Sequence, residues 1–241
     1  MPYSTFNFTE QQVLMRNSVL GLMERVLPPE TIAELDRESQ FPREAYKALA
    51  ENGWLTLPYD KAHGGMDASH KDLAVFIEAL GYHHPGIRVS FMSTAVYGGL
   101  YLQNLGNAAL QAEILGGMQD GTIRTAIAFS EPDSGSDAAG IHTRAVRDGN
   151  DWVISGQKVY VTNAHEADYL IVSTKTYPDA GCRGLCLFMV DTAQPEFETR
   201  PIDPLGSRST LLNEVFFDDV RIPGNRLLGA LNGGWHALCA G

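Results

Sequence analysis

Apolar residues recur with helical spacing through the first half of the chain, from residue 9 to about residue 117. Thr9 and Gln12 match the capping-box pattern of a helix start, and apolar residues then repeat every three or four positions until Pro28-Pro29. Further helices are expected over residues 42–53, from residue 69 and over residues 87–105. The first half of the chain is therefore predicted to be all-α.

The last of these helices contains the pair Gly98-Gly99. Each glycine costs about 1 kcal/mol in a helix interior relative to alanine. Two explanations are open: another part of the protein approaches the backbone closely there, or the helix bends.

After Gly121 the apolar pattern changes to a period of two. Seven short segments rich in β-branched and aromatic residues are separated by turn residues, and Asp148-Gly149 is a hairpin signal. The expected strands are residues 122–129, 143–147, 151–154, 158–162, 169–174, 184–191 and 214–222. No crossover helix fits between them, so we expect an antiparallel barrel or sandwich and not a parallel sheet.

The predicted fold class is α+β, with an N-terminal all-α helical domain followed by an antiparallel β-barrel or sandwich domain. We place the domains at residues 1–120, 121–225 and 226–241. Residues 235–240 read as the opening of a helix that is too short to be stable alone. We expect that the chain stops at the start of a third, helical domain.

Composition narrows the class of protein. The 241 residues are 44% hydrophobic and 20% charged, as in a globular protein, and the longest apolar run has six residues, so no membrane span is expected. A net charge of −11 argues against a nucleic-acid surface. Residues 1–8 lack the features of a secretory signal or transit peptide, which predicts a cytoplasmic location.

The cysteine and histidine pattern does not indicate a metal site. Cys182, Cys186 and Cys239 are odd in number and fit a reducing compartment. For Cys182 and Cys186, buried hydrophobic roles are favoured over zinc binding. His83-His84 have no second ligand at a suitable spacing. Arg208 and Arg221 are candidates for ion pairs with Asp218-Asp219, but a solvated charged face is the favoured interpretation.

Two segments hold the candidate chemistry. Residues 129–137 (FSEPDSGSD) follow a predicted strand and concentrate hydroxyls, carboxylates and a glycine in one loop. Such a loop is either a turn capped by its own side chains or a functional loop on a rigid scaffold. In the second segment, residues 156–164, strand alternation places Tyr160 and Thr162 on the same side.

Together these segments resemble the acyl-CoA dehydrogenase family, flavoproteins that introduce a double bond between the α and β carbons of an acyl-CoA thioester. The resemblance covers essentially the whole chain. Its ordered matches are residues 42–58, 63–65, 129–137, 160–163 and 214–223. It implies an N-terminal α-helical domain, a middle β domain and a C-terminal helical bundle that this chain lacks apart from its first turn.

The resemblance implies FAD as the cofactor. Ser130 corresponds to the residue that hydrogen-bonds the pyrimidine side of the flavin, and Ile127 and Phe129 offer neighbouring main-chain groups. Thr162 corresponds to the residue near flavin N5, and Tyr160 to the aromatic residue against the ring.

The diphosphate and the substrate are expected at the end of the same loop. Gly135 would let the backbone approach the diphosphate, and Ser136 corresponds to a residue that touches both diphosphate and substrate. Glu131 and Asp137 are expected to brace the loop and not to act as catalysts. Residues that could line the acyl pocket are Phe91, Tyr97 and Leu100.

The family's catalytic base is a glutamate of the C-terminal domain, and no residue of this chain matches it. We therefore expect no catalytic residue here and no activity of the chain alone. The partners implied for the whole protein are an acyl-CoA substrate, an electron-transferring flavoprotein and further copies of itself in a homo-oligomer. Two alternatives are open: a short non-catalytic module that binds acyl-CoA or a partner, and a flavin-dependent monooxygenase of the same architecture.

Overall fold

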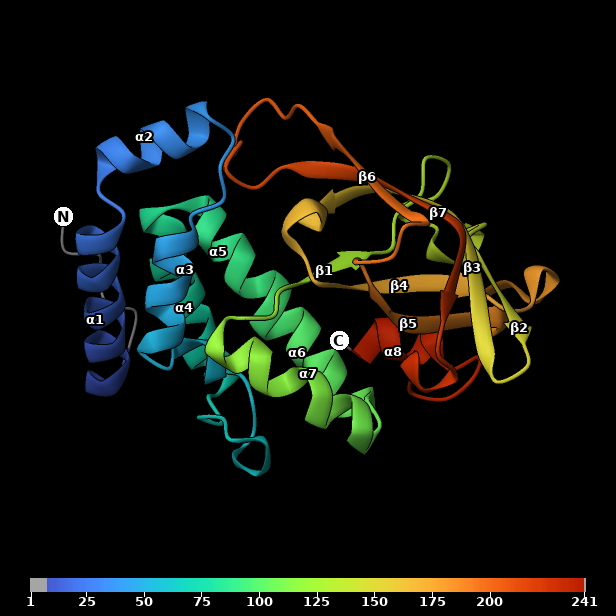
Figure 1. Ribbon diagram of the computed structural model, residues 1–241. Coiled ribbons are helices and arrows are strands. Elements are labelled where there is room, and N and C mark those ends of the chain that lie inside the picture. The colour runs from blue at the N-terminus through green and yellow to red at the C-terminus, as the bar shows by residue number, and fades with distance from the viewer. Residues whose placement is uncertain (1–7, 241) are drawn as a thin grey trace.

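The computed structural model describes residues 8–240 and consists of a helical half beside a β half (Figure 1). The helices of the first half are α1 (Glu10–Val26), α2 (Pro29–Arg37), α3 (Arg43–Glu51), α4 (His70–His83), α5 (Pro85–Phe91), α6 (Gly99–Leu105) and α7 (Ala108–Asp120). Residues 1–7, on which the expectation of a cytoplasmic location partly rests, lie outside the described residues. Within residues 8–240, no helix combines the length and the apolar character that a membrane span requires.

The helix ends follow the predicted capping chemistry. The Thr9 hydroxyl accepts a hydrogen bond from the Gln12 amide at 3.2 Å, and the Gln12 side chain accepts one from the Thr9 amide, so the capping box is confirmed. Gly53 follows α3 with a φ of 75°, a left-handed conformation in which glycine has no steric penalty. The helix α2 was not predicted, because Pro29 ends the apolar repeat of α1 and at the same time occupies the first turn of α2.

The pair Gly98-Gly99 lies in one continuous helix over residues 85–105, called the long helix below. The close approach of neighbouring residues to its backbone explains the two glycines. A segment of π-helix, Met92–Gly98, joins α5 and α6. A Cβ on Gly98 would lie 1.9 Å from Oγ1 of Thr125, and a Cβ on Gly99 would lie 2.2 Å from the ring of Tyr59. The pair therefore lets the helix pack directly on β1 and on the loop that contains Tyr59.

The β half is one eight-stranded sheet with the order β6-β7-β3-β2-β4-β5-β8, and β1 pairs with β4 outside this path. The strands are β1 (Thr125–Ala128), β2 (Arg144–Asp148), β3 (Asp151–Thr162), β4 (Tyr169–Lys175), β5 (Leu185–Asp191), β6 (Phe197–Ile202), β7 (Leu212–Ile222) and β8 (Leu227–Leu228). The hairpin at Gly149 is confirmed, since Asp148 pairs with Asp151 across it.

The sheet is mainly antiparallel, as predicted, but β1 and β4 run parallel. One residue pair also joins β2 to β4 in parallel, so the prediction of an antiparallel and not a parallel sheet is confirmed apart from these two contacts of β4. The hairpin of β2 and β3 lies between β1 and β4 along the chain and provides the return path, so this parallel pair needs no crossover helix.

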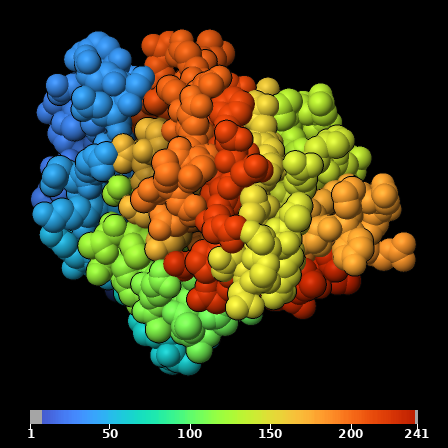
Figure 2. All heavy atoms as spheres, turned by 45° about the vertical axis from the view of Figure 1, so that its right-hand side comes forward, coloured from blue at the N-terminus to red at the C-terminus, as the bar shows by residue number. Residues whose placement is uncertain are grey.

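The helical and β halves share a hydrophobic core. Residues of α6 and α7, such as Leu102 and Ile114, pack with Ile171 of β4 and Leu187 of β5. The last described helix, α8 (Gly234–Ala240), packs against β5. A second contact between the halves lies at α2, where the Asp36 carboxylate accepts a 2.8 Å hydrogen bond from the Arg208 amide. Figure 2 shows the orange segment of the β half beside the blue helices.

The structure gives both arginines ion-pair partners other than the candidates Asp218-Asp219, and both side chains are partly exposed. Arg221 pairs with Asp148 and Asp151 across the β2–β3 hairpin, and Arg208 pairs with Asp203. The prediction considered only neighbours close in sequence, whereas strand pairing sets which side chains lie opposite each other.

Candidate functional site

A cavity of about 220 Å³ lies where the long helix meets strands β1 and β3. Three of the predicted flavin-binding residues, Ile127, Tyr160 and Thr162, line it together. The opposite wall belongs to the helix and consists of Arg88, Val89, Met92, Ser93 and Tyr97. Segments more than 30 residues apart in sequence therefore form one site.

Tyr160 reaches this cavity through an irregularity in β3. Between the pairs Lys158–Val215 and Val161–Asn213, β3 has two residues where β7 has one, which is a β-bulge. Tyr160 has a φ of 59°, an unfavourable conformation for a bulky side chain, and its ring is 64% exposed. Strained backbone that holds an exposed aromatic ring in a cavity is typical of a binding site.

Hydrogen bonds beside the cavity join the long helix to β1. The Thr125 amide donates to the Thr94 hydroxyl at 3.1 Å, and the Ser93 hydroxyl donates to the Thr125 carbonyl at 3.0 Å. Because these groups are buried, their hydrogen bonds fix the helix against β1.

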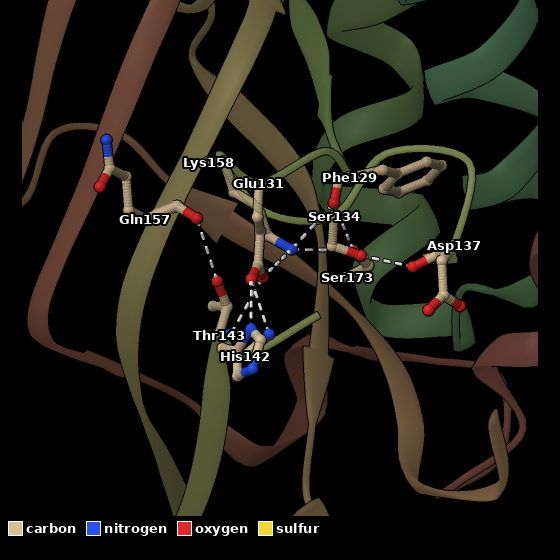
Figure 3. A network of polar contacts seen from close by, with 9 residues as sticks. All are labelled: Phe129, Glu131, Ser134, Asp137, His142, Thr143, Gln157, Lys158 and Ser173. Atoms are coloured by element: carbon tan, nitrogen blue, oxygen red, sulfur yellow. Dashed lines mark hydrogen bonds and ion pairs between the residues drawn. The ribbon is translucent and has the colours of Figure 1, made fainter. Parts of the chain in front are cut away.

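A buried lysine, Lys158, lies on β3 next to the cavity-lining segment and was not predicted from the sequence. Lys158 is 0% exposed, and its Nζ donates to Glu131 Oε1 at 2.8 Å, to the Phe129 carbonyl at 3.0 Å and to Ser173 Oγ at 3.0 Å (Figure 3). All three ammonium protons thus have partners. A signal for this was present: counting in twos from the core residues Trp152 and Ile154 places Lys158 on the same face.

Glu131 is the acceptor at the centre of this network (Figure 3). Its carboxylate accepts hydrogen bonds from the amides of His142 at 2.6 Å and Thr143 at 2.9 Å, in addition to that of Lys158. Burial raises the pKa of Glu131, but the Lys158 charge and these hydrogen bonds outweigh burial, so the pKa lies below its usual value. Burial lowers the pKa of Lys158 to about 8, although the Glu131 charge acts in the opposite direction.

The predicted bracing role of Glu131 is therefore confirmed, and that of Asp137 takes a different form. The carboxylate of Asp137 is exposed, and its main-chain carbonyl accepts a hydrogen bond from the Ser134 hydroxyl. Glu131 and Ser134 also exchange main-chain hydrogen bonds, which closes the turn.

The other predicted site residues lie on this loop but do not line the cavity. The Ser130 carbonyl accepts a 2.9 Å hydrogen bond from the Val159 amide, which places the loop against β3 beside the bulge. The Phe129 carbonyl is bound by Lys158 and Ser173. Gly135 and Ser136 are exposed on the turn, and a Cβ on Gly135 would have open space around it.

A larger cavity of about 480 Å³ lies farther along the long helix, toward its C-terminal end. Tyr97 and Leu100, two of the residues expected at an acyl pocket, line it together with Leu73, Val96 and Tyr101. Phe91, the third, does not: it is fully buried in the helical core, 4.9 Å from the ring of Phe76. Helical periodicity places Phe91 on the face toward α4, which explains the error.

Two family models match this chain. The N-terminal domain of acyl-CoA dehydrogenases matches residues 9–122, and their middle domain matches residues 126–220. A long-chain specific mitochondrial acyl-CoA dehydrogenase of Mus musculus is 32% identical over 96% of this chain and 54% of its own length. A probable acyl-CoA dehydrogenase of Mycobacterium bovis is 29% identical over 99% of this chain and 61% of its own length.

Solved structures agree with the family models. The glutaryl-coenzyme A dehydrogenase in a glutaryl-CoA complex has a TM-score of 0.91 at 25% identity, over 97% of this chain and 60% of that one. This chain spans about three-fifths of the length of such relatives, 61% for the first of them. Since the two family models together match most of the 241 residues, the chain belongs to the acyl-CoA dehydrogenase family.

Proposed function

We propose that the protein takes part in the FAD-dependent α,β-dehydrogenation of an acyl-CoA thioester, with this chain supplying the flavin-binding wall. The observation that carries the proposal is Tyr160, a strained and exposed aromatic residue that shares one cavity with Ile127 and Thr162. The Tyr160 ring and the Ile127 side chain suit the flat faces of an isoalloxazine. The Thr162 hydroxyl suits its polar edge.

The chemistry of the donor set fits this cofactor. FAD, when bound, accepts the hydride that leaves the substrate's β carbon. The Thr162 hydroxyl would donate a hydrogen bond to the polar edge of the ring, while the Ser130 hydroxyl would bind its pyrimidine side. The open space around Gly135 and the exposure of Ser136 leave room for an anionic diphosphate on the turn.

The 480 Å³ cavity is proposed to hold the acyl chain. Its lining is mainly apolar, with His70 and Asn104 as polar groups, and it adjoins Tyr97, which also lines the smaller cavity. An acyl chain is apolar along its length and polar at the thioester, so this arrangement matches it.

A carboxylate-bearing acyl group is a specific form of this substrate that one observation favours. Arg88 is the single charged residue in the lining of the smaller cavity, and its Nη1 contacts the sulfur of Met92 at 3.6 Å. A guanidinium in an otherwise uncharged wall attracts an anionic group. A carboxylate at the end of the acyl group would therefore reach Arg88 past Tyr97, which lines both cavities. One similar structure is described as a glutaryl-CoA complex, and glutaryl-CoA carries such a carboxylate.

Removal of the substrate's α-proton and onward transfer of the electrons use groups outside the 220 Å³ cavity. We assign no catalytic base to residues 8–240. The electrons are proposed to pass to an electron-transferring flavoprotein, and the whole protein is proposed to assemble as a homo-oligomer in the cytoplasm.

The test is a titration of the purified protein with FAD, followed by addition of an acyl-CoA under anaerobic conditions. We expect saturable quenching of FAD fluorescence, weakened by Tyr160→Ala and by Thr162→Val. Tyr177→Ala is the matched control, because Tyr177 is also 64% exposed but does not line the cavity. Equal losses in Tyr160→Ala and Tyr177→Ala would remove the basis for the site.

The alternatives give different results in the same assay. Binding of acyl-CoA by a protein that never binds FAD would indicate a non-catalytic module. Consumption of oxygen with a hydroxylated product would indicate a monooxygenase.

A further inference from the structure

We propose that Lys158 is a positioning residue that holds the two flavin-binding segments at a fixed separation. This inference rests on the function proposed above. It extends that function from the residues that would touch the flavin to a buried group that places them.

The contacts of Lys158 surround Ser130. Its Nζ donates to the carbonyl of Phe129 at 3.0 Å and to the carboxylate of Glu131 at 2.8 Å, the two residues on either side of Ser130. The Ser130 carbonyl is bound in turn by the amide of Val159, the residue after Lys158. The main chain on both sides of the Ser130 hydroxyl is thus anchored to two consecutive residues of β3.

Lys158 and Val159 also lie at the start of the bulge in β3. Val159 and Tyr160 are the two residues of β3 that lie opposite one residue of β7 in the bulge, and Thr162 ends the strand. Lys158 is also bound to Ser173 of β4 at 3.0 Å, so it joins the loop, β3 and β4 (Figure 3). Together with the Val159 amide, this ammonium group sets the position of Ser130 relative to Tyr160 and Thr162.

Stability alone does not account for a charged group at this place. Burying a lysine and a glutamate costs desolvation, and well-packed apolar residues of similar size often stabilise a protein as much or more. A charged pair differs in imposing one geometry, because each of its hydrogen bonds requires a defined direction. Fixed geometry is what a preorganised cofactor site needs.

The experiment compares FAD affinity in variants of the folded protein. The first variant, Lys158→Met, removes the positive charge. The second combines Lys158→Met with Glu131→Gln, so that no unpaired anion stays buried. The glutamine oxygen still accepts hydrogen bonds from the loop amides. Val190→Ala is the control, since Val190 is fully buried in the same sheet on β5 and its loss lowers stability without touching the loop. Dissociation constants are measured by fluorescence quenching at a temperature where circular dichroism shows each variant folded.

We expect FAD to bind about 10- to 100-fold more weakly to the Lys158 variants and with unchanged affinity to Val190→Ala. The decisive readout is coupling to Ser130. Ser130→Ala alone should weaken binding about fivefold, the loss of one hydrogen bond, whereas in the doubly substituted background it should change binding less than about twofold.

The outcomes distinguish a failure of the positioning role from a failure of the proposed function. Unchanged affinity in the double variant, or an effect of Ser130→Ala that is the same in both backgrounds, would overturn the positioning role while leaving the flavin site intact. Failure of the unaltered protein to bind FAD at all would overturn the proposed function, and the inference with it.

Discussion

Replacing Gly99 by alanine tests how closely the long helix packs on its neighbours. In a helix interior alanine is more stable than glycine by about 1 kcal/mol, so propensity alone predicts stabilisation. The new Cβ, however, would lie 2.2 Å from Cε1 and the hydroxyl oxygen of Tyr59 and 2.5 Å from its Cζ, and Tyr59 is 0% exposed. A buried ring cannot swing aside, and overpacking of this kind costs up to about 3 kcal/mol.

The net expectation for Gly99→Ala is a loss of about 2 kcal/mol in the free energy of unfolding, or about 4–8 °C in melting temperature. Gly116→Ala is the matched control, because Gly116 lies inside α7 and its Cβ would meet nothing within 4 Å. We expect Gly116→Ala to raise the free energy of unfolding by about 1 kcal/mol. Urea denaturation followed by circular dichroism measures both. The reasoning is refuted if Gly99→Ala is as stable as the unaltered protein, or if both alanines shift stability equally.

Three further predictions concern the charged groups of the site. Glu131→Gln leaves Lys158 buried without its anion and should cost about 3–5 kcal/mol at pH 7, measured by denaturant unfolding; a change below about 1 kcal/mol would contradict it. Because the pKa of Glu131 is lowered in the folded state, its stabilisation is present above about pH 4.5 and is lost as the pH falls further, so the acid limb of a stability–pH curve should be flatter in Glu131→Gln. Arg88→Met should weaken the binding of a dicarboxylic acyl-CoA more than that of an uncharged acyl-CoA of equal length, in calorimetric titrations, while Arg183→Met on the surface should affect neither.

Much of the fold was predictable because it follows from local rules. The capping box at Thr9 and the hairpin at Gly149 depend on side chains within four residues of each other, and both are observed. The strand β6, Phe197–Ile202, was missed because charged residues and a proline interrupt its apolar pattern. It lies at the edge of the sheet, where such residues are tolerated.

The candidate site was predictable in part. Ile127, Tyr160 and Thr162 do meet at one cavity, while the assigned contacts of Ser130, Gly135 and Ser136 with the cofactor stay predictions. The strand phase marks Lys158 as facing the core, but its partner Glu131 lies 27 residues away in sequence. Nothing local links the two, because the parallel pairing of β1 with β4 and the register of β3 decide which side chains meet.

The central claim is that the Ser130 loop and the Tyr160–Thr162 segment form one side of a single flavin site. A crystal structure of the protein with FAD tests it most directly. We expect an isoalloxazine in the cavity of Ile127, Tyr160 and Thr162, with the Ser130 hydroxyl within hydrogen-bonding distance of its pyrimidine edge. Electron density for the flavin at any other surface, or a Ser130 hydroxyl directed away from the ring, would contradict it.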